Sequence, residues 1–383
     1  MKKTTIPMIL LFFASCTHLK NDIPKDIGSI KITIDKPIAF DKLKASDYVD
    51  SIAYVFLETK EDCYVAEITG LYMINDTILI FDRKLNSIIV FSNSGRFIKK
   101  IVSRKDLSGG DILNVVQFEK SILVTSNRIS DILVFNLNGE KIRQIPSSPF
   151  KFSCGAIEPD IFVDFFPDIS VKYNKNFHFS IRNSEGKITN QFISEKRSLI
   201  GIKGVLQARF YQQCNELHLF SAELSQIFVI NKNHIYPSYL FLSGNEKEFP
   251  SPVNDGVFEI DNVIESKTYL FIDAIIDKHL YNYVYQKSNN VLKPVEIIQN
   301  SRSFIFGILN DVDGIYPVWP IFSINDSLYA RTIMPKAVLD YHFNKENDSM
   351  LLESSSRKVL EQFRNRKPVE NPVIILYKFK NHE

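Results

Sequence analysis

The sequence lacks the short motifs that mark many enzyme classes, and it has no excess of either charge. No HExxH, GxSxG or Walker-type pattern occurs in its 383 residues, so zinc proteases, α/β-hydrolases and P-loop nucleotide hydrolases have no support. The 46 basic and 44 acidic residues leave a net charge of +2 without a basic stripe. A nucleic-acid partner requires such a stripe, so the charge balance argues against one.

Cysteine is scarce, which excludes a disulfide framework. Apart from a cysteine near the N-terminus, the chain has only Cys63, Cys154 and Cys214, which allow at most one disulfide and leave one free thiol. No cysteine forms a CxxC pair and the histidines stand singly, so we predict no metal ion and no cofactor. We expect the three cysteines to be buried as small apolar side chains.

The chain also lacks an apolar run long enough to span a bilayer, but its start has the layout of an export signal. Met1–Lys3 is basic, and the apolar stretch Ile6–Phe13 that follows is short. A membrane-spanning helix needs roughly 20 apolar residues, whereas this order of segments is typical of a cleaved signal. We therefore predict a signal peptide over residues 1–15.

The signal ends in Phe13-Ala14-Ser15-Cys16, which resembles a bacterial lipobox, although Phe13 stands where Leu is usual. In a lipobox the signal peptidase cuts before the cysteine, and the cysteine thiol then carries diacylglycerol. The resemblance implies an acyl anchor on Cys16 and a polar tether over residues 16–29, with the lipid bilayer as a partner. An ordinary secretory signal with an incidental cysteine is the alternative.

Glycine is sparse at 14 residues, whereas Phe and Tyr number 30 and 16, a composition that favours strands. The stretch Leu71–Lys100 shows the pattern clearly. Its apolar runs Leu71–Ile74, Ile78–Asp82 and Ser87–Phe91 are separated by Asn, Asp, Ser and Gly, which are turn residues. We expect these runs to form one antiparallel meander.

Weaker copies of this meander recur along the chain. Phe91 and Gly95 correspond to Phe135 and Gly139, each 44 residues later. The strands expected in the later copies are Val115–Phe118, Ser121–Thr125, Asp131–Phe135, Ile161–Phe166, Ile169–Tyr173, Phe177–Arg182, Val205–Tyr211, Glu216–Phe220, Gln226–Ile230, Val263–Ile276, Leu280–Gln286, Val295–Ile298, Pro317–Ile324, Ser327–Thr332 and Pro372–Phe379. Six units of about 45 residues predict an all-β fold, a six-bladed β-propeller of four-stranded antiparallel blades. A large β-sandwich is the main alternative, and the regular repeat argues against it.

Closure of the ring would remove the exposed strand edges of the first and last blades. An N-terminal strand, either Ile30–Ile34 or Ile52–Leu57, is expected to pair with Pro372–Phe379 in the last blade. Ser354–Arg366 has an apolar stripe at helical spacing, so one short helix is predicted near the C-terminus, before the last strand. The propeller would then form a single domain over residues 30–383.

Two groups of residues connect the chain with known proteins. They are Leu57–Thr59, Ile78–Arg83, Asn86–Phe91 and Ser94–Phe97 near the start, and Asn310–Gly314, Pro317–Pro320 and Glu370–Leu376 near the end. In these segments the chain resembles the six-bladed β-propeller lipoproteins of Gram-negative anaerobes, which are related to NHL-repeat propellers. The resemblance implies an outer-membrane lipoprotein that faces the periplasm or the cell surface, and it implies no established reaction.

The loop that joins the first two units is the best candidate for ligand binding. Arg104, Lys105, Asp106 and Asp111 give it both charge signs, and Gly109-Gly110 would let its backbone approach a ligand closely. The resembling family often has a Gly-Pro-Gly-Glu type loop here, from which this chain departs. A flexible polar connection is the alternative.

Three further positions allow both a functional and a structural interpretation. Trp319, the only tryptophan, would either stack on a sugar or pack in the core. Asp311-x-Asp313-Gly314 begins like a calcium loop but lacks the later ligands, so aspartates that hold a turn are the better interpretation. Asp82-Arg83 would either face a ligand or shape a blade corner, and we favour the corner.

The sequence therefore predicts a monomeric binding or scaffold module, held at a membrane through Cys16, that binds a protein, peptide or glycan at one end of the ring. The alternative is a carbohydrate-active enzyme, a hydrolase or lyase with acidic residues around the central channel, because propellers serve both purposes. An enzyme should place two carboxylates, or a carboxylate and a histidine, face to face in a deep central pocket. A binder should present mixed polar and aromatic side chains.

Overall fold

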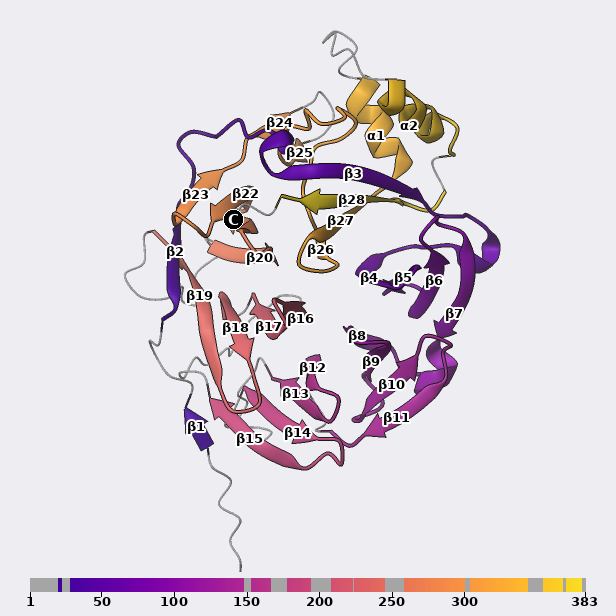
Figure 1. Ribbon diagram of the computed structural model, residues 1–383, viewed down its shortest axis with the longest axis vertical. Coiled ribbons are helices and arrows are strands. Elements are labelled where there is room, and N and C mark those ends of the chain that lie inside the picture. The colour runs from indigo at the N-terminus through magenta and orange to yellow at the C-terminus, as the bar shows by residue number, and fades with distance from the viewer. Residues whose placement is uncertain are drawn as a thin grey trace, which may run out of the picture.

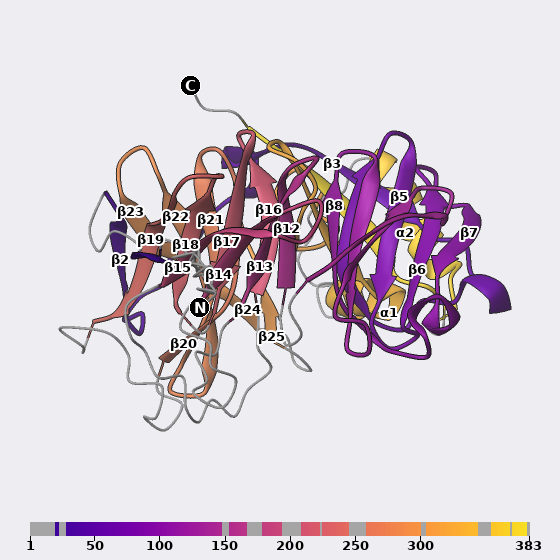
Figure 2. The ribbon, with the colours of Figure 1, turned by 90° about the horizontal axis from the view of Figure 1, so that it is seen from below.

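Six four-stranded antiparallel sheets stand around a central axis as the blades of a propeller (Figure 1). The structure is a computed structural model and describes residues 20–22, 28–147, 153–166, 178–193, 208–222, 224–244, 258–299, 304–343, 354–367 and 370–380. Seen edge-on, the strands run across the thickness of the disc (Figure 2). This arrangement confirms the predicted fold class.

In each blade the first strand lies nearest the axis and the fourth lies at the rim (Figure 1). Each of the first five blades is a continuous segment of the chain, and the sixth takes its outermost strand from the N-terminal region. The strands, from the axis outward, are β4 (Ile68–Ile74), β5 (Thr77–Asp82), β6 (Ser87–Ser92) and β7 (Phe97–Val102) in blade one; β8 (Ile112–Phe118), β9 (Ser121–Ser126), β10 (Ile132–Asn136) and β11 (Lys141–Ile145) in blade two; β12 (Ser153–Glu158), β13 (Ile161–Phe165), β14 (Phe179–Asn183) and β15 (Ile188–Ile193) in blade three; β16 (Ala208–Gln213), β17 (Glu216–Ser221), β18 (Gln226–Ile230) and β19 (Ile235–Ser243) in blade four; β20 (Phe258–Glu265), β21 (Tyr269–Ile276), β22 (His279–Gln286) and β23 (Val291–Pro294) in blade five; and β26 (Phe322–Ser323), β27 (Leu328–Ile333), β28 (Val373–Phe379) and β3 (Val49–Phe56) in blade six.

The central strands of a blade are buried on both faces because neighbouring blades cover them. In β5 and β6 nearly every side chain is buried, whereas four of the five residues of the outer strand β11 are exposed. The apolar clusters accordingly lie between blades; one of them joins residues of β5 and β6 to residues of β8, β9 and β10. A strand buried on both faces is a continuous apolar run, which is the pattern that identified these strands in the sequence.

The ring is closed by the second of the two candidate strands. β3 pairs antiparallel with β28, from Val373 opposite Phe56 to Phe379 opposite Val49. The other candidate, β2 (Ile30–Ile34), pairs parallel with β19 as a fifth strand on blade four. The expected pairing of an N-terminal strand with the last blade is therefore confirmed.

The N-terminal segment runs along the rim of four blades before it closes the ring (Figure 1). β1 (Lys20–Asp22) pairs with β15 of blade three, and β2 pairs with β19 of blade four. Asp41 then forms a bridge to Val295, which follows the last strand of blade five, and β3 completes blade six. Strands and a bridge of the N-terminal region thus pair with the outer side of four consecutive blades.

Turn glycines repeat from blade to blade. Gly95, Gly139 and Gly186 have φ of 84°, 84° and 81°, values that favour glycine. Each lies between the third and fourth strand of its blade and touches backbone of the preceding blade; a Cβ on Gly139 would lie 2.8 Å from the carbonyl oxygen of Ile101. The predicted correspondence of Gly95 with Gly139 therefore reflects a repeated contact between blades.

Several strand boundaries differ from the expectation. The run Val263–Ile276 was expected as one strand, but it contains a turn in which the Ser266 hydroxyl accepts hydrogen bonds from the N–H groups of Thr268 and Tyr269. The last strand of blade five is β23 instead of Val295–Ile298, and part of that range lies in β24 (Ile297–Gln299), which pairs with β25 (Phe304–Phe306). The expected strand Ile169–Tyr173 falls outside the described residues.

Two helices accompany blade six (Figure 1). α2 (Ser354–Arg364) confirms the predicted helix, and α1 (Pro335–Phe343) was not expected. Phe363 of α2 packs edge-on against Tyr54 and Phe56 of β3, with ring centroids 5.9 and 5.0 Å apart. The helices therefore cover the strand that closes the ring. Within the described residues, no helix is long and apolar enough to cross a membrane.

Candidate functional site

The predicted binding loop between β7 and β8 contains a short 3-10 turn, and two of its four charged side chains form an ion pair with each other. Asp106 accepts hydrogen bonds from the backbone N–H and the hydroxyl of Ser103, both at 2.8 Å. Arg104 and Asp111 form an ion pair at 2.7 Å on the surface, and Lys105 is exposed. The structure thus gathers the predicted residues in one loop, and their role in ligand binding stays a prediction.

Trp319, the other predicted ligand contact, lies in the core. Only 3% of its surface is exposed, and it packs edge-on against Phe271 with ring centroids 5.5 Å apart. Its indole N–H donates a hydrogen bond to Asp273 at 2.8 Å. This placement agrees with the core-packing alternative, because stacking on a sugar would require the ring to leave the core.

For Asp82 and Asp311 the sequence allowed both a functional and a structural role, and in the structure both accept hydrogen bonds from nearby backbone. Asp82 is fully buried and accepts hydrogen bonds from the N–H groups of Ala66 and Leu85, at 2.5 and 2.8 Å. Asp311 accepts hydrogen bonds from the N–H and the hydroxyl of Ser46, at 2.8 and 2.7 Å. Both contacts agree with the structural interpretation of these positions.

The expectation that all three cysteines are buried is wrong for Cys214. Cys63 and Cys154 are buried, whereas Cys214 is exposed, and all three are free thiols. Cys214 lies in the turn between β16 and β17 with φ of 51°, and its backbone N–H donates to Asp326 at 3.0 Å. Cys214 was expected to be buried because apolar strands flank it in sequence. It lies at the tip of a hairpin, however, where side chains point away from the core.

Two cavities lie along the axis of the ring, at its opposite ends. The hairpin-end cavity holds about 760 Å³ and is surrounded by turns that follow the innermost strands, including Glu119, Asn215 and Asp326. The strand-start cavity holds about 790 Å³ and is lined by residues near the starts of those strands and by residues of the neighbouring second strands, such as Phe81, Phe220 and Asp273. Four residues line both cavities and therefore form the waist of the channel, namely Thr69, Tyr72, Arg209 and Phe322.

The hairpin-end cavity combines aromatic and amide side chains with an acidic rim. Its apolar lining includes Phe118, Phe210, Tyr211 and Ile324, and its amides are Gln117, Gln212, Asn215 and Asn325. Glu119, Glu158 and Asp326 supply the carboxylates, and all three are exposed at the hairpin turns. Its volume is within the usual range of small-ligand sites, roughly 300–1,000 Å³.

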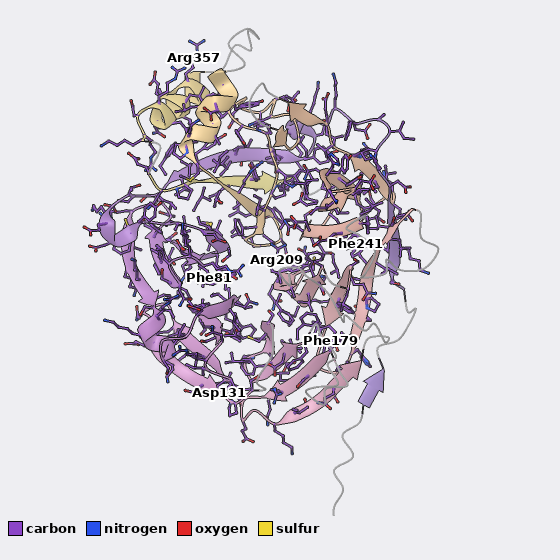
Figure 3. All side chains as sticks on the ribbon, turned by 180° about the vertical axis from the view of Figure 1, so that it is seen from behind. Phe81, Asp131, Phe179, Arg209, Phe241 and Arg357 are labelled. Atoms are coloured by element: carbon purple, nitrogen blue, oxygen red, sulfur yellow. The ribbon has the colours of Figure 1, made fainter. Side chains whose placement is uncertain are left out.

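Arg209 carries a positive charge at the waist of the channel, near the centre of the ring (Figure 3). It comes from β16 and donates hydrogen bonds to the carbonyl oxygens of Val263 at 2.6 Å and Ile321 at 3.2 Å, and to the amide oxygen of Asn262 at 3.1 Å. The guanidinium thus bridges blades four, five and six. Burial lowers its pKa, although Tyr211, Tyr72 and Asp273 oppose this effect.

Asn262 lies between Arg209 and the carboxylate of Asp273. Its amide accepts from Arg209 and donates to Asp273 at 3.3 Å. Asp273 also accepts hydrogen bonds from Trp319 and Asn282. Burial raises the pKa of Asp273 to about 6, even though the donors around it act in the opposite direction. Arg209 is therefore held by neutral acceptors and makes no direct ion pair among the described residues.

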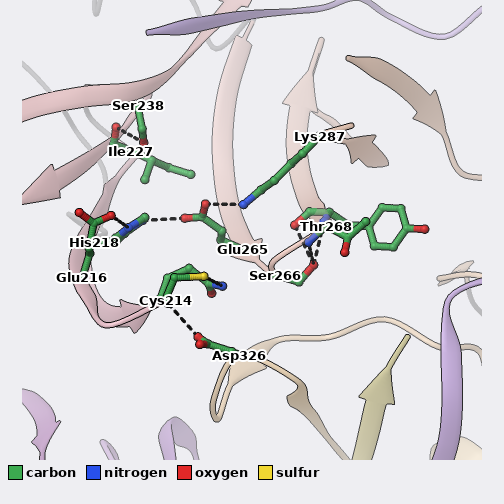
Figure 4. Close-up of polar contacts among 12 residues, drawn as sticks. Cys214, Glu216, His218, Ile227, Ser238, Glu265, Ser266, Thr268, Lys287 and Asp326 are labelled. Atoms are coloured by element: carbon green, nitrogen blue, oxygen red, sulfur yellow. Dashed lines mark hydrogen bonds and ion pairs between the residues drawn. The ribbon is translucent and has the colours of Figure 1, made fainter. Parts of the chain in front are cut away.

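A buried charged cluster lies next to the channel, between blades four and five (Figure 4). Glu265 accepts hydrogen bonds from Tyr211 at 2.7 Å and from Lys287 at 2.6 Å, and it contacts Nδ1 of His218 at 2.8 Å. Burial alone would raise the pKa of Glu265, but His218 and Lys287 outweigh burial and lower it to about 2. Of this cluster, only Tyr211 lines either of the two axial cavities described above.

This geometry does not favour catalysis. The carboxylate–histidine pair expected of an enzyme exists as Glu265 and His218, but both are buried behind the cavity wall and engaged with each other. Among the described residues, no group of three or more His, Cys, Asp or Glu could hold a metal ion. The hairpin-end cavity offers aromatic rings, amides and one guanidinium beside its exposed rim carboxylates, which are groups for binding. Asp261 and Asp273 line the strand-start cavity, where Asp273 is engaged by Trp319, Asn262 and Asn282.

The blades and the axial channel define the class of this protein, a six-bladed β-propeller. Residues 29–378 match a family described as a domain of unknown function, DUF4934, and the chain belongs to that family. A protein of Bacteroides fragilis described as exported has a similar fold, with 14% sequence identity and a TM-score of 0.67 over 92% of this chain and all of that chain.

Other comparisons add little beyond the fold. A member of the DUF4221 family from Bacteroides vulgatus is 11% identical with a TM-score of 0.44, covering 87% of this chain and 97% of that one. No curated protein matches the sequence.

Proposed function

We propose that this protein is a binding module that holds a small ligand, or the end of a larger one, in the axial channel. The hairpin-end cavity supports this proposal because it combines size, aromatic walls and convergent amides at one end of a closed ring. Its strands belong to packed blades, so the cavity is preformed and little free energy of binding is lost in ordering it. A carbohydrate-active enzyme is the weaker candidate, since the buried Glu265–His218 pair does not face the channel.

We also propose that the module is a lipoprotein anchored in the outer membrane through Cys16, facing the periplasm or the cell surface. The lipobox-like end of the signal and the resemblance to lipoprotein propellers support this proposal. Cys16 itself lies outside the described residues. Acyl chains on one residue would hold the ring at a membrane surface and leave the channel accessible.

The proposal is tested by blocking the channel. Thr69 is exposed towards the channel although it lies on the innermost strand β4, so Thr69→Trp should fill the waist. Thr189→Trp, on the outer strand β15, is the matched control. The protein from Thr17 onward would be screened on a glycan array and in pull-downs with peptide pools. We expect Thr69→Trp to abolish capture and Thr189→Trp to leave it unchanged; ligands that bind both variants alike would refute a channel site.

A further inference from the structure

We infer that the channel receives the free C-terminal carboxylate of a short peptide, which Arg209 binds at the waist, while neutral or basic residues of the peptide lie along the hairpin-end cavity. This inference rests on the proposed channel-binding function and specifies its ligand. It follows from the positions of the charges along the channel.

Arg209 has unused donors in a place that a ligand can reach. A guanidinium offers five N–H donors in a fixed plane, and three of those on Arg209 are engaged by Val263, Ile321 and Asn262. The other two, on Nε and Nη1, have no acceptor within the part of the chain that the structure describes. Arg209 lines both cavities, so an acceptor that enters from either end can contact it.

A carboxylate is the acceptor that fits this position. Removing a cation from water costs energy unless an opposite charge compensates it, and the three protein acceptors on Arg209 are neutral carbonyl and amide oxygens. Asp273 acts on Arg209 only at a distance, because the Asn262 amide lies between the two groups, so the guanidinium has no direct carboxylate contact among the described residues. A planar carboxylate also matches the fork geometry of a guanidinium.

The rim of the hairpin-end cavity indicates what precedes that carboxylate. Glu119 and Asp326 lie at its hairpin turns, and Glu119 has no ion-pair or hydrogen-bond partner among the described residues. Glu158 pairs with Lys232 at 3.3 Å across the surface. A ligand with several carboxylates, such as a polyuronate, would be repelled by this rim. A peptide with one terminal carboxylate and a basic residue upstream would be attracted at both ends.

The first experiment uses the protein without substitutions. A pool of random tetrapeptides with free carboxyl ends, and the same pool with amidated ends, would be equilibrated with the protein by dialysis, and the retained peptides identified by mass spectrometry. Glucuronic acid and glucose serve as an acidic and a neutral sugar probe. We expect the free-acid pool to be retained at least tenfold more than the amidated pool, with Lys and Arg enriched upstream of the last residue.

Three results would overturn the inference. Equal retention of both pools would show that the terminal carboxylate is not recognised. Retention of glucuronic acid without any peptide would assign Arg209 to an acidic sugar instead. If glucose alone were retained, and Thr69→Trp abolished that retention, the channel-binding function would stand and only the peptide ligand would be refuted. If no probe from the peptide, glycan or sugar sets bound in the channel, the proposed function would fail as well.

A second experiment changes the cation. Arg209→Gln should weaken binding of a retained free-acid peptide about thirtyfold, as expected when one partner of a buried charge pair is lost. Its affinity should then equal that of the amidated form of the same peptide for the unsubstituted protein. Arg364→Gln is the control, because Arg364 is exposed on α2, at the outer side of blade six and away from the channel (Figure 1). Since Arg209 also links three blades, Arg209→Lys provides a variant that keeps the charge. It should bind more tightly than Arg209→Gln and more weakly than the unsubstituted protein; unchanged affinity in both would refute the role of Arg209.

Discussion

Glu265 should make the stability of the ring depend on pH in a narrow acidic range. The Glu265→Gln substitution removes a charge that pairs with Lys287 and contacts His218 between blades four and five. The pKa of Glu265 is lowered from 4.5 to about 2 in the folded protein, and each pKa unit corresponds to about 1.4 kcal/mol. The ionised carboxylate therefore contributes about 3 kcal/mol to the free energy of unfolding at neutral pH.

The sign of this dependence follows from the direction of the shift. Because the folded pKa is below the unfolded one, the contribution is complete above pH 4.5 and is lost as the pH falls towards about 2. Glu265→Gln lacks the contribution at every pH. We expect the variant to be about 3 kcal/mol less stable than the unsubstituted protein at pH 7, and the difference to shrink between pH 5 and about 2.

Urea unfolding followed by circular dichroism at several pH values measures this difference directly. Comparing the two proteins at each pH cancels the titration of the other carboxylates. Glu185→Gln is the matched control, because Glu185 is exposed in the turn between β14 and β15 and should change stability little at any pH. A constant difference between the Glu265→Gln variant and the unsubstituted protein from pH 7 to pH 3 would refute the reasoning, since Glu265 would then act through its shape rather than its charge.

Three further predictions concern the ring and its anchor. Gly139→Ala should lower stability by about 1–3 kcal/mol in denaturant unfolding, because its Cβ would press on the carbonyl of Ile101 at positive φ; Gly28→Ala, with similar φ but open space, should cost less. Deleting Val373–Phe379 should unfold the ring, so an unchanged melting temperature would contradict its role in closure. Cys16→Ala should release the protein from membranes in fractionation, and continued tight association would refute the anchor.

The strands that the sequence predicted well are those whose signal is local. The central strands of blade one are continuous apolar runs, and a glycine with positive φ marks the turn after them. The break at Ser266 escaped prediction because a serine hydroxyl makes that turn without glycine, proline or asparagine at its centre. Outer strands such as β11 were missed for the opposite reason: their polar side chains face solvent, so they lack an apolar run.

The candidate site could not be predicted because ring closure assembles it. Arg209 lies within an expected strand, and its only local signal is a charged residue next to Phe210 on a strand that was expected to be apolar. Its partners Val263 and Ile321 are 54 and 112 residues away in sequence. The same holds for Glu265 and His218, which are 47 residues apart. Contacts at such separations depend on which blades are neighbours, and no local pattern encodes that.

Comparison of the two candidate sites favours the channel over the predicted loop. In the loop, Arg104 and Asp111 already neutralise each other at 2.7 Å, and both are more than half exposed. A charged ligand there would have to break an ion pair and compete with water, and exposed pairs contribute only about 0–1 kcal/mol. Among the described residues Arg209 has no direct ion-pair partner, and it keeps two donors unengaged at the waist of the channel. An anion at Arg209 therefore gains a charge interaction without breaking an ion pair, which is the condition under which a single charge can determine the choice of ligand.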